Sequence, residues 1–501
     1  MISYLRVRWF IMRPSDIFHN LKLYTMMRRL LFALLMVPFA LVSWAQNKKE
    51  VHILSANDMH AAIECFPRLC FVADSLRTLY PDLLVLSAGD NRSGDPINDM
   101  YEIPAYPMVA LMNIVGFHAT TLGNHEFDSG QEGLAELINM SDFSYLCANA
   151  HPAESTGIHI RPYQKFDVGG VSVGIIGAVA LGPIGKPESH PKNMTDITFT
   201  QPLEALQQYQ FLRKECDVVL FLSHIGYEDD VKISASLPWV DLIVGGHSHT
   251  QLDGGEIHNG LLITQNVNRL ARVTHITLTV ENGKVVDKRA ENIAIKGVKR
   301  ENKVVATLTD AFTHNPAFDE ILAVNDKPLS TYEELGCLMT DAYLKAANAD
   351  ISLQNYGGVR YDTLSARGIS VKDVLQLDPF QNSLVEMTVT GNEFIDILKM
   401  CFVNDQARFP LISGATAEYV LDDTKQQIKK VVLYGPDGKK LNLKKTYRVV
   451  TNNYVQAITP TDRKDEGHDL GIGSAEAIMQ FLKAKGHIDY QGKTNVKEIK
   501  K

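Results

Sequence analysis

The chain has 501 residues, of which 45% are hydrophobic and 22% are charged. This composition is ordinary for a folded globular protein and excludes a disordered or fibrous chain. The length allows two or three domains, each able to bury a core. Acidic residues outnumber basic ones by 58 to 50, and the resulting charge of -8 argues against a protein that binds nucleic-acid polymers non-specifically.

The chain begins with a candidate targeting segment. The apolar run Leu30–Trp44 follows a basic pair and is shorter than the ~20 residues that span a bilayer. Small residues, Ser43 and Ala45, stand where a signal peptidase would require them. We therefore expect residues 1–45 to be a signal peptide and the protein to be secreted across the inner membrane, periplasmic or extracellular. An uncleaved anchor is the alternative, and residues 1–25 suggest an over-extended gene start.

Six cysteines lie beyond that segment, which is too few for a disulfide framework in a chain of this length. Cys147 and Cys216 stand in or beside apolar runs and are expected to be buried thiols. Cys65 and Cys70 are close enough in sequence to pair, and the sequence leaves this open.

From residue 51, short β-branched runs alternate with amphipathic stretches. Strands are predicted at 51–57, 82–88, 143–148, 171–179, 217–223 and 241–246. Helices are predicted at 68–79, 104–115, 131–140 and 202–214. This alternation indicates a layered α/β domain, which we place at residues 48–299.

Residues 272–296 predict a hairpin that turns at Asn282-Gly283. The charged stretch 300–325 is compatible with a helix and is interpreted as a connector. A second α/β domain is expected at 326–501. Its predicted elements are helices at 333–347 and 391–402, a turn at 356–358, and strands at 350–354, 428–434 and 446–451.

Polar residues gather in five short segments of the first domain, four of them where a predicted strand ends. These segments are Asn57–His60, Ser87–Asp90, Gly123–Asp128, Ser223–His224 and Gly245–Thr250. Functional groups of α/β sheets collect at the carboxyl ends of the strands. The shorter segments are individually just as typical of surface turns, whereas the six residues 123–128 are much more specific.

The spacing within these segments is typical of metal ligands. Asp58 and His60 are two residues apart and would point to the same side of an extended chain, as would His247 and His249. Asn124 offers a neutral oxygen. Seven candidate ligands result, which are Asp58, His60, Asp90, Asn124, His224, His247 and His249.

Seven nitrogen and oxygen ligands are enough for two divalent ions that share a carboxylate, and the lack of thiolates favours Mn, Zn, Fe or Co. Two ions ~3.5–4 Å apart can clamp the attacking and leaving oxygens of an in-line displacement at phosphorus. Next to Asn124, His125 and Asp128 are spaced so that the carboxylate can orient the imidazole.

The order D-x-H, G-D, G-N-H-E-x-D, H and G-H-x-H resembles that of the calcineurin-like metallophosphoesterases. With a secretion signal and a second domain, the chain is similar to the secreted 5'-nucleotidase/UDP-sugar hydrolase family. The resemblance covers about residues 50–490. It implies an α/β fold, in which a four-layer αββα sandwich precedes a smaller α/β nucleotidase C-terminal domain.

The resemblance also implies roles for the residues. Asp58, His60 and His249 would hold one ion, and Asn124, His224 and His247 the other, with Asp90 shared. A hydroxide bridging the ions would attack phosphorus in line. His125, oriented by Asp128, would stabilise the transition state and protonate the leaving oxygen.

The second domain resembles the substrate-binding domain of the same family. Asn355–Arg360 follows its N-x-G-G-[IV]-R motif, which implies that Asn355, Gly358 and Arg360 bind the substrate. Phe380 and Tyr454 match the aromatic residues that stack on the base, and packing in the core is the alternative. Arg92 in the first domain could meet a phosphate or be a solvated turn residue.

Three departures from the family pattern concern this second domain. No G-G-D-G loop follows Tyr454, no arginine precedes the helix at 333–347, and Gln381 replaces the glycine after Phe380. We therefore expect a secreted hydrolase of nucleoside 5'-monophosphates, a small-molecule substrate, with no stable membrane span after signal cleavage. The alternatives are a related phosphoesterase that acts on 2',3'-cyclic nucleotides, 3'-nucleotides or UDP-sugars, and a secreted nucleotide-binding protein without activity.

Overall fold

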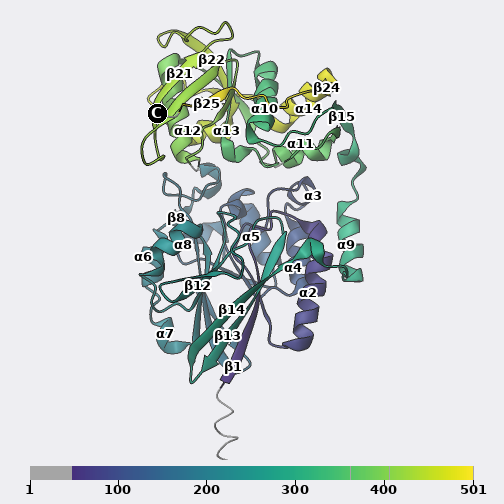
Figure 1. The fold of residues 1–501 in the computed structure, drawn as a ribbon, viewed down its shortest axis with the longest axis vertical. Helices are drawn as coiled ribbons and strands as arrows, with labels where there is room; N and C mark the ends of the chain where they lie inside the picture. Colours follow the sequence, from purple (N-terminus) through teal and green to yellow (C-terminus); the bar gives the residue numbers. More distant parts are fainter. Residues whose placement is uncertain (1–47, 362, 406, 500–501) are drawn as a thin grey trace, which may run out of the picture.

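The computed structural model describes residues 48–361, 363–405 and 407–499. The predicted signal peptide and gene-start region lie outside these residues. Two α/β domains are stacked along the long axis of the molecule and are joined on one side by a helical segment (Figure 1). Within the described ranges, no helix is both long and apolar enough to cross a membrane.

The first domain contains two six-stranded sheets. One has the strand order β14-β13-β1-β2-β3-β4 and the other β11-β12-β10-β9-β7-β6. The first is built from β1 (Lys48–Ala56), β2 (Leu84–Ser87), β3 (Ala119–Thr121), β4 (Ser144–Leu146), β13 (Arg272–Glu281) and β14 (Lys284–Ala294). The second is built from β6 (Tyr163–Val168), β7 (Val171–Val179), β9 (Val218–His224), β10 (Leu242–Gly245), β11 (Glu256–His258) and β12 (Leu261–Thr264).

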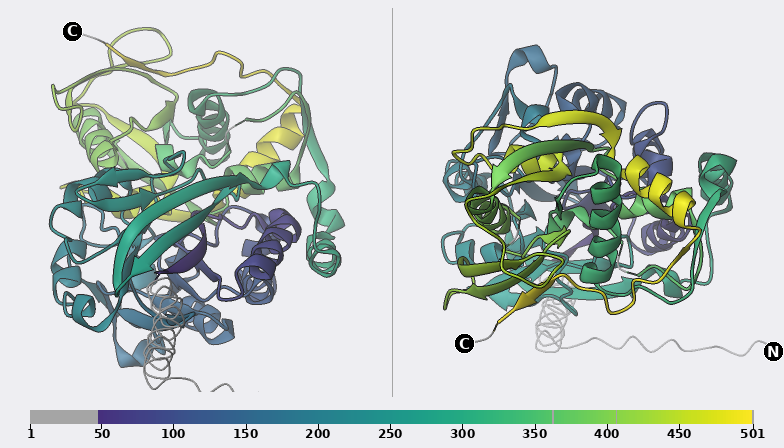
Figure 2. Two further views of the ribbon diagram at one scale, coloured as in Figure 1. Left: turned by 60° about the horizontal axis from the view of Figure 1, so that its bottom comes forward. Right: turned by 90° about the horizontal axis from the view of Figure 1, so that it is seen from above.

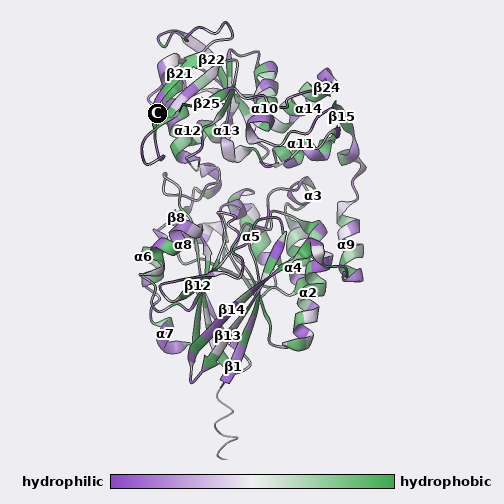
Figure 3. Cartoon of the chain, viewed as in Figure 1, coloured by the Kyte–Doolittle hydropathy of each residue, from purple (hydrophilic) through white to green (hydrophobic). Residues whose placement is uncertain are grey.

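The sheets pack face to face through aliphatic side chains that alternate along the strands. Val51 and Ile53 of β1 lie in the core between the sheets, whereas Leu54 and Ala56 point to the opposite face and pack under helices. This period of two is what a strand buried on both faces requires. Figure 3 shows hydrophobic residues in green along the strands of this domain, interleaved with hydrophilic residues in purple.

Helices cover the outer face of each sheet and complete the αββα arrangement that the resemblance implies. The first sheet is covered by α2 (Phe66–Leu79), α4 (Tyr106–Val115) and α5 (Gly130–Met140), and the second by α6 (Pro202–Gln207), α7 (Leu212–Glu215) and α8 (Tyr227–Ser234). The single helix predicted at 202–214 is therefore wrong in one respect, because residues 208–211 interrupt it. Tyr209 and Phe211 turn there to pack their rings against Tyr163.

The hairpin predicted at 272–296 is confirmed as β13–β14, with Asn282 and Gly283 both at positive φ as a tight two-residue turn requires. It forms the outer edge of the first sheet and is seen as the long teal ribbon in Figure 2.

The connector differs from the prediction of one helix over 300–325. The helix α9 spans only Lys303–Thr313 and packs against α2. Asn315-Pro316 then starts a short 3-10 turn, because proline disfavours a helical residue before it. Residues Ile321–Asn325 form a strand, β15, that pairs with β17 (Arg367–Ser370) and β24 (His487–Ile488) of the second domain.

The second domain has a central five-stranded sheet of order β19-β16-β22-β18-β23, and its smaller sheets are β17-β15-β24 and β21-β20-β25. The central strands are β16 (Ile351–Gln354), β18 (Ser383–Thr390), β19 (Leu411–Ser413), β22 (Thr446–Asn452) and β23 (His468–Gly473), and a smaller sheet adds β20 (Thr416–Leu421), β21 (Ile428–Tyr434) and β25 (Val496–Glu498). The main helices are α10 (Tyr332–Ala347), α11 (Val371–Leu377), α12 (Gly391–Asn404), α13 (Asn453–Ile458) and α14 (Ser474–Lys485). The predicted helices at 333–347 and 391–402 are thus confirmed as α10 and α12.

All six cysteines are buried and free, so that Cys65 and Cys70 do not form a disulfide in this structure.

Candidate functional site

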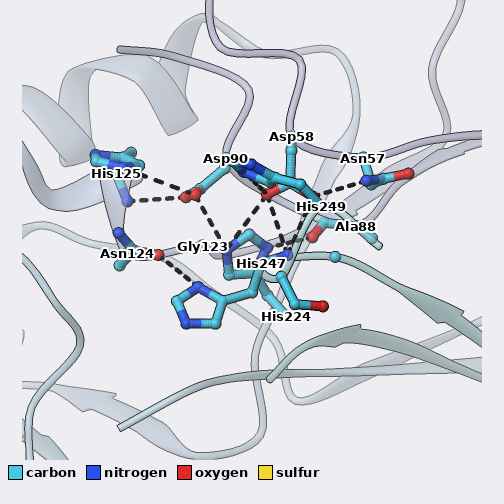
Figure 4. Close-up of polar contacts among 12 residues, drawn as sticks. Asn57, Asp58, Ala88, Asp90, Gly123, Asn124, His125, His224, His247 and His249 are labelled. Atoms are coloured by element: carbon cyan, nitrogen blue, oxygen red, sulfur yellow. Dashed lines mark hydrogen bonds and ion pairs between the residues drawn. The ribbon is translucent and has the colours of Figure 1, made fainter. Parts of the chain in front are cut away.

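The polar segments of the first domain meet at one end of its two sheets. Asp58, Asp90 and Asn124 follow β1, β2 and β3, while His224 ends β9 and His247 follows β10. The strands β1, β2 and β3 run parallel to one another, as do β9 and β10. Their carboxyl ends therefore open into a common space, where the side chains converge (Figure 4).

Asp58, His60 and His249 form one group of potential ligands. The Nε2 atoms of His60 and His249 are 3.1 Å apart, and His249 Nε2 lies 3.4 Å from Asp58 Oδ1. His60 Nδ1 donates to the carbonyl of Ser93, which leaves the Nε2 lone pair directed into the group. The three residues are close enough together to hold a single metal ion.

Asp90, His224 and His247 form a second such group. His224 Nε2 lies 3.2 Å from Asp90 Oδ2, and Nδ1 of the same ring donates to the carbonyl of Ala88 at 2.6 Å. His247 Nδ1 lies 3.0 Å from Asn124 Oδ1, which brings the amide oxygen to this group as well. Asp90 Oδ2 is also 4.0 Å from His60 Nε2, so that its carboxylate stands between the two groups (Figure 4).

The electrostatics of these groups fit divalent cations. Asp58, Asp90 and His224 are essentially inaccessible to solvent. Burial opposes a charge on His224, but the carboxylates of Asp90 and Asp58 outweigh it and raise the pKa of the ring to about 10. The buried carboxylates need a compensating positive charge, and a proton on His224 supplies it here. Bound metal ions would provide this positive charge instead.

Two other histidines are held neutral, the form in which imidazole binds metals. Burial, and then the charges on His224 and other neighbours, lower the pKa of His247 to about 4. Burial and the nearby Arg360 guanidinium keep the pKa of His60 well below its usual range.

The backbone around the ligands is strained. Asp58, His60, Asp90, His247 and His249 all have φ between +43° and +75°, a region that non-glycine residues rarely adopt. Such conformations persist where function requires them and the surrounding structure enforces them. At Gly123 a side chain would collide with that of Asp90, which explains the glycine before Asn124.

Glu126 joins the two loops that carry Asp90 and Asn124. Its buried carboxylate accepts the backbone N–H of Asp90 at 2.9 Å, of Asn91 at 2.8 Å and of Gly123 at 2.6 Å. The residue belongs to the predicted motif at 123–128, but its role as a clamp was not predicted.

His125 and Asp128 are brought together as predicted. His125 Nδ1 lies 2.8 Å from Asp128 Oδ2, and His125 Nε2 lies 4.0 Å from Asp90 Oδ2. Burial works against the protonated ring, but the carboxylates of Asp128 and Asp90 outweigh it and raise the pKa of His125. A histidine in this setting can carry a proton to a reacting oxygen.

Two serines that the sequence did not identify donate hydrogen bonds to Asp128 of this pair. Ser93 Oγ donates to Asp128 Oδ2 at 2.6 Å, and Ser189 Oγ donates to Asp128 Oδ1 at 2.8 Å. The loop that carries Ser189 also accepts a hydrogen bond from the side-chain amide of Asn124 through the carbonyl of Glu188. No motif links residue 189 to residue 128, so only the tertiary structure could reveal these contacts.

The second domain brings a cation and an aromatic ring to the same place. Arg360 Nη2 lies 3.2 Å from His60 Nε2, across the domain boundary. Phe380 stacks on His125 with ring centroids 5.6 Å apart and planes inclined by 17°, and the Arg360 guanidinium lies 5.7 Å from the centre of the Phe380 ring. Gln381 has a φ of 54°, so it keeps a backbone conformation that glycine would adopt more readily.

A cleft between the domains collects the remaining predicted residues. Asn355, Gly358, Arg360, Phe380 and Tyr454 of the second domain line it together with Asn124, His125 and Asp128 of the first. Two carboxylates that the sequence did not identify, Glu188 and Asp405, line it as well. Asp405 is buried and accepts the backbone N–H of Gly357 at 2.9 Å, which anchors the turn before Arg360.

Comparison with known proteins agrees with this architecture. Residues 51–251 match the calcineurin-like phosphoesterase family, and residues 304–458 match the 5'-nucleotidase C-terminal domain. The protein UshA of Yersinia enterocolitica is 28% identical, over 93% of this chain and 97% of that protein. A 5'-nucleotidase of Vibrio vulnificus is 26% identical, over 81% of this chain and 83% of its own length.

The solved structure of a 5'-nucleotidase precursor from Thermus thermophilus superposes with a TM-score of 0.80 at 25% identity, over 90% of this chain and 100% of that one. Both domains of the chain therefore have counterparts in one family. The chain belongs to the calcineurin-like phosphoesterases that carry a 5'-nucleotidase C-terminal domain, and it is a metal-dependent phosphoester hydrolase.

Proposed function

We propose that the protein is a secreted two-metal phosphohydrolase that removes the phosphate of nucleoside 5'-monophosphates. The observation that carries this proposal is the contact of Arg360 and Phe380 with His60 and His125. A cation and an aromatic ring from the second domain thus face the metal-ligand groups of the first. A phosphate joined to a nucleoside offers the charge and the aromatic base that such a cleft would recognise.

Asp58, His60 and His249 would hold one divalent ion, and Asn124, His224 and His247 the other, with Asp90 shared. When bound, the ions would supply Lewis acidity toward a water nucleophile and toward the phosphoryl oxygens. The burial of Asp58 and Asp90 keeps bulk water from screening these charges.

His125 would donate a proton to the leaving 5'-oxygen. The Asp128 carboxylate accepts from Nδ1 and so fixes the tautomer and the direction of Nε2. Ser93 and Ser189 each donate a hydrogen bond to one oxygen of Asp128, which keeps Asp128 aligned with His125. Arg360 would neutralise charge on the phosphate as the transition state forms.

Phe380 and Tyr454 would hold the base between them, and Asn355 and Gly358 would bind it or the sugar at its edge. Asp405 would take the place of the acid of the missing G-G-D-G loop. Asp405 lies at the end of α12, close to the Tyr454 phenol. Burial raises the pKa of this phenol, and the charge on Asp405 raises it further. This supports a nucleoside-binding cleft despite the altered sequence.

The test is a substrate panel for the purified protein loaded with Mn or Zn. We expect metal-dependent turnover of AMP to exceed that of UDP-glucose, 2',3'-cyclic AMP and bis-p-nitrophenyl phosphate. Faster turnover of a diester or of UDP-glucose would show that the protein is a related phosphoesterase and not a 5'-nucleotidase. If the metal-loaded protein turns over none of these substrates, the protein is a nucleotide-binding protein without activity.

A further inference from the structure

Arg92 is a buried cation that forms no ion pair with any of the described residues. The residue is 5% exposed, and the only hydrogen bond of its guanidinium within the described residues runs from Nη1 to Ser129 Oγ. Its Nε is buried and has no acceptor. Among the described residues, no carboxylate lies within ion-pair distance of it. The alternative of a solvated turn arginine, which the sequence left open, is therefore wrong.

The carboxylates of Asp99 and Asp128 interact with the Arg92 charge, but both already accept hydrogen bonds from other donors. Asp99 accepts the backbone N–H of Ser93 at 3.1 Å, of Gly94 at 2.7 Å and of Asp95 at 3.2 Å. Asp128 is shared by His125, Ser93 and Ser189. Burying a guanidinium with most of its donors unused is costly, unless an anion completes the site.

Arg92 lines a cavity between the domains with room for such an anion. The cavity measures about 370 Å³. Its lining includes the already hydrogen-bonded carboxylates of Asp99 and Asp128, and the polar side chains of Ser129, Asn193, Gln381 and Asn453. It shares Asp128, His190, Asn193, Phe380 and Asn382 with the cleft proposed for the nucleotide. The two spaces therefore adjoin.

We propose that Arg92 and this cavity form a second oxyanion subsite, which binds a phosphate-class anion beside the reacting phosphate. The planar guanidinium with free donors matches the geometry of phosphate oxygens. Two sources supply this chemistry. One is a second phosphate on the substrate, as in a nucleoside 3',5'-bisphosphate, and the other is free inorganic phosphate, the product of hydrolysis. The subsite does not depend on which ester the enzyme prefers.

The direct test is titration calorimetry of inorganic phosphate into the full-length protein freed of metal by a chelator. Arg92→Gln should weaken phosphate binding by about tenfold or more, as the loss of a buried charge-assisted pair implies. Arg289→Gln is the matched control, because it removes an exposed arginine of the same domain. Absence of binding to the parent protein, or equal binding to Arg92→Gln, would overturn the proposal. Loss of binding in Arg360→Gln but not in Arg92→Gln would also overturn it.

The variant Arg92→Lys and thermal unfolding experiments distinguish a folding defect from a loss of phosphate binding. Arg92→Lys keeps the charge and should retain part of the affinity. Phosphate should raise the unfolding temperature of the parent protein and of Arg289→Gln, but not that of Arg92→Gln. A stabilisation by phosphate that survives in Arg92→Gln would contradict the subsite.

The two sources of the anion are distinguished with the metal-loaded enzyme. The ratio of kcat/KM for adenosine 3',5'-bisphosphate to that for AMP reports on a second substrate phosphate. A fall of this ratio by about tenfold in Arg92→Gln would assign the subsite to the substrate. An unchanged ratio with weakened phosphate binding would assign it to the free ion. Failure of the proposed nucleotidase activity would leave the calorimetric test intact.

Discussion

The ring of Phe380 lies on the imidazole of His125, with centroids 5.6 Å apart and planes inclined by 17°. The two residues belong to different domains and are 255 positions apart. The aromatic surface of the second domain is therefore in direct contact with the histidine that we propose as the proton donor. A base bound at Phe380 would bring its 5'-phosphate close to the metal-ligand groups.

Replacement of Phe380 by alanine should separate nucleotide binding from phosphate chemistry. Loss of a base-stacking ring costs about 1–3 kcal/mol, which corresponds to roughly a 5- to 150-fold rise in KM for AMP. The KM for p-nitrophenyl phosphate, which has no nucleobase, should change much less. Steady-state kinetics of both substrates provide the measurement.

Phe211→Ala is a suitable control for this change, because Phe211 is a partly exposed aromatic residue of the first domain, remote from the cleft. Equal losses with both substrates would mean that Phe380 supports the structure of the domain interface and does not bind the base.

His125→Ala should lower kcat by about 10²- to 10⁴-fold, the usual contribution of a general acid. The metal content, measured by atomic emission, should stay near that of the parent protein, because His125 belongs to neither of the two groups assigned to the ions. Loss of both metals in this variant would show that His125 is a ligand and that its assignment is wrong.

Asp90→Asn should remove metal and activity together. The Asp90 carboxylate stands between the two ligand groups, 3.2 Å from His224 Nε2 and 4.0 Å from His60 Nε2. An amide has no charge to offer two cations, so both sites should weaken. Asp128→Asn offers the contrast, since it should lose activity but retain metal. Full metal occupancy in Asp90→Asn would contradict the shared position.

Much of this site could be predicted because its ligands lie in short segments at strand ends. Asp58, Asp90, Asn124 and His224 each follow or end a β-branched or apolar run, and the parallel strands bring these ends to one edge. The aliphatic pattern likewise predicted most strands of the first domain. Asn282-Gly283 located the hairpin because both residues tolerate positive φ.

The remaining contacts depend on tertiary structure. Ser189 contacts Asp128 from a loop 61 residues away, and no motif around Ser189 in the sequence indicates this contact. Asp405 enters the cleft from the end of α12, where an acid is otherwise unremarkable. The sequence could not decide whether Arg92 is a solvated turn residue, because its burial depends on tertiary packing, which local composition does not indicate.

Glu126→Gln should weaken metal binding without touching a ligand. One carboxylate oxygen would become an NH₂ group that faces backbone N–H donors, and an unmade buried hydrogen bond costs about 1–3 kcal/mol. The loops that carry Asp90 and Asn124 should then loosen, so that metal affinity falls by about tenfold or more. Competition with a chelator measures the affinity. The exposed Glu136→Gln on α5 is the control, and an unchanged affinity in Glu126→Gln would rule out the clamp.

The buried carboxyl of Asp378, beside the Phe380 loop, should make stability depend on pH. Burial raises its pKa from 3.8 to about 6, although the Tyr343 hydroxyl donates to it at 3.2 Å. Between these values the folded protein holds a proton that the unfolded chain has released. Stability therefore falls as pH rises from about 4 to 6 and then levels off, by up to about 3 kcal/mol. Asp378→Asn cannot ionise and still accepts from Tyr343, so its urea midpoint should exceed that of the parent protein at pH 7 and approach it near pH 4. Exposed Asp437→Asn should show no such pH-dependent gain. A gain of equal size at both pH values would show that folding does not shift the pKa of Asp378, which would contradict this prediction.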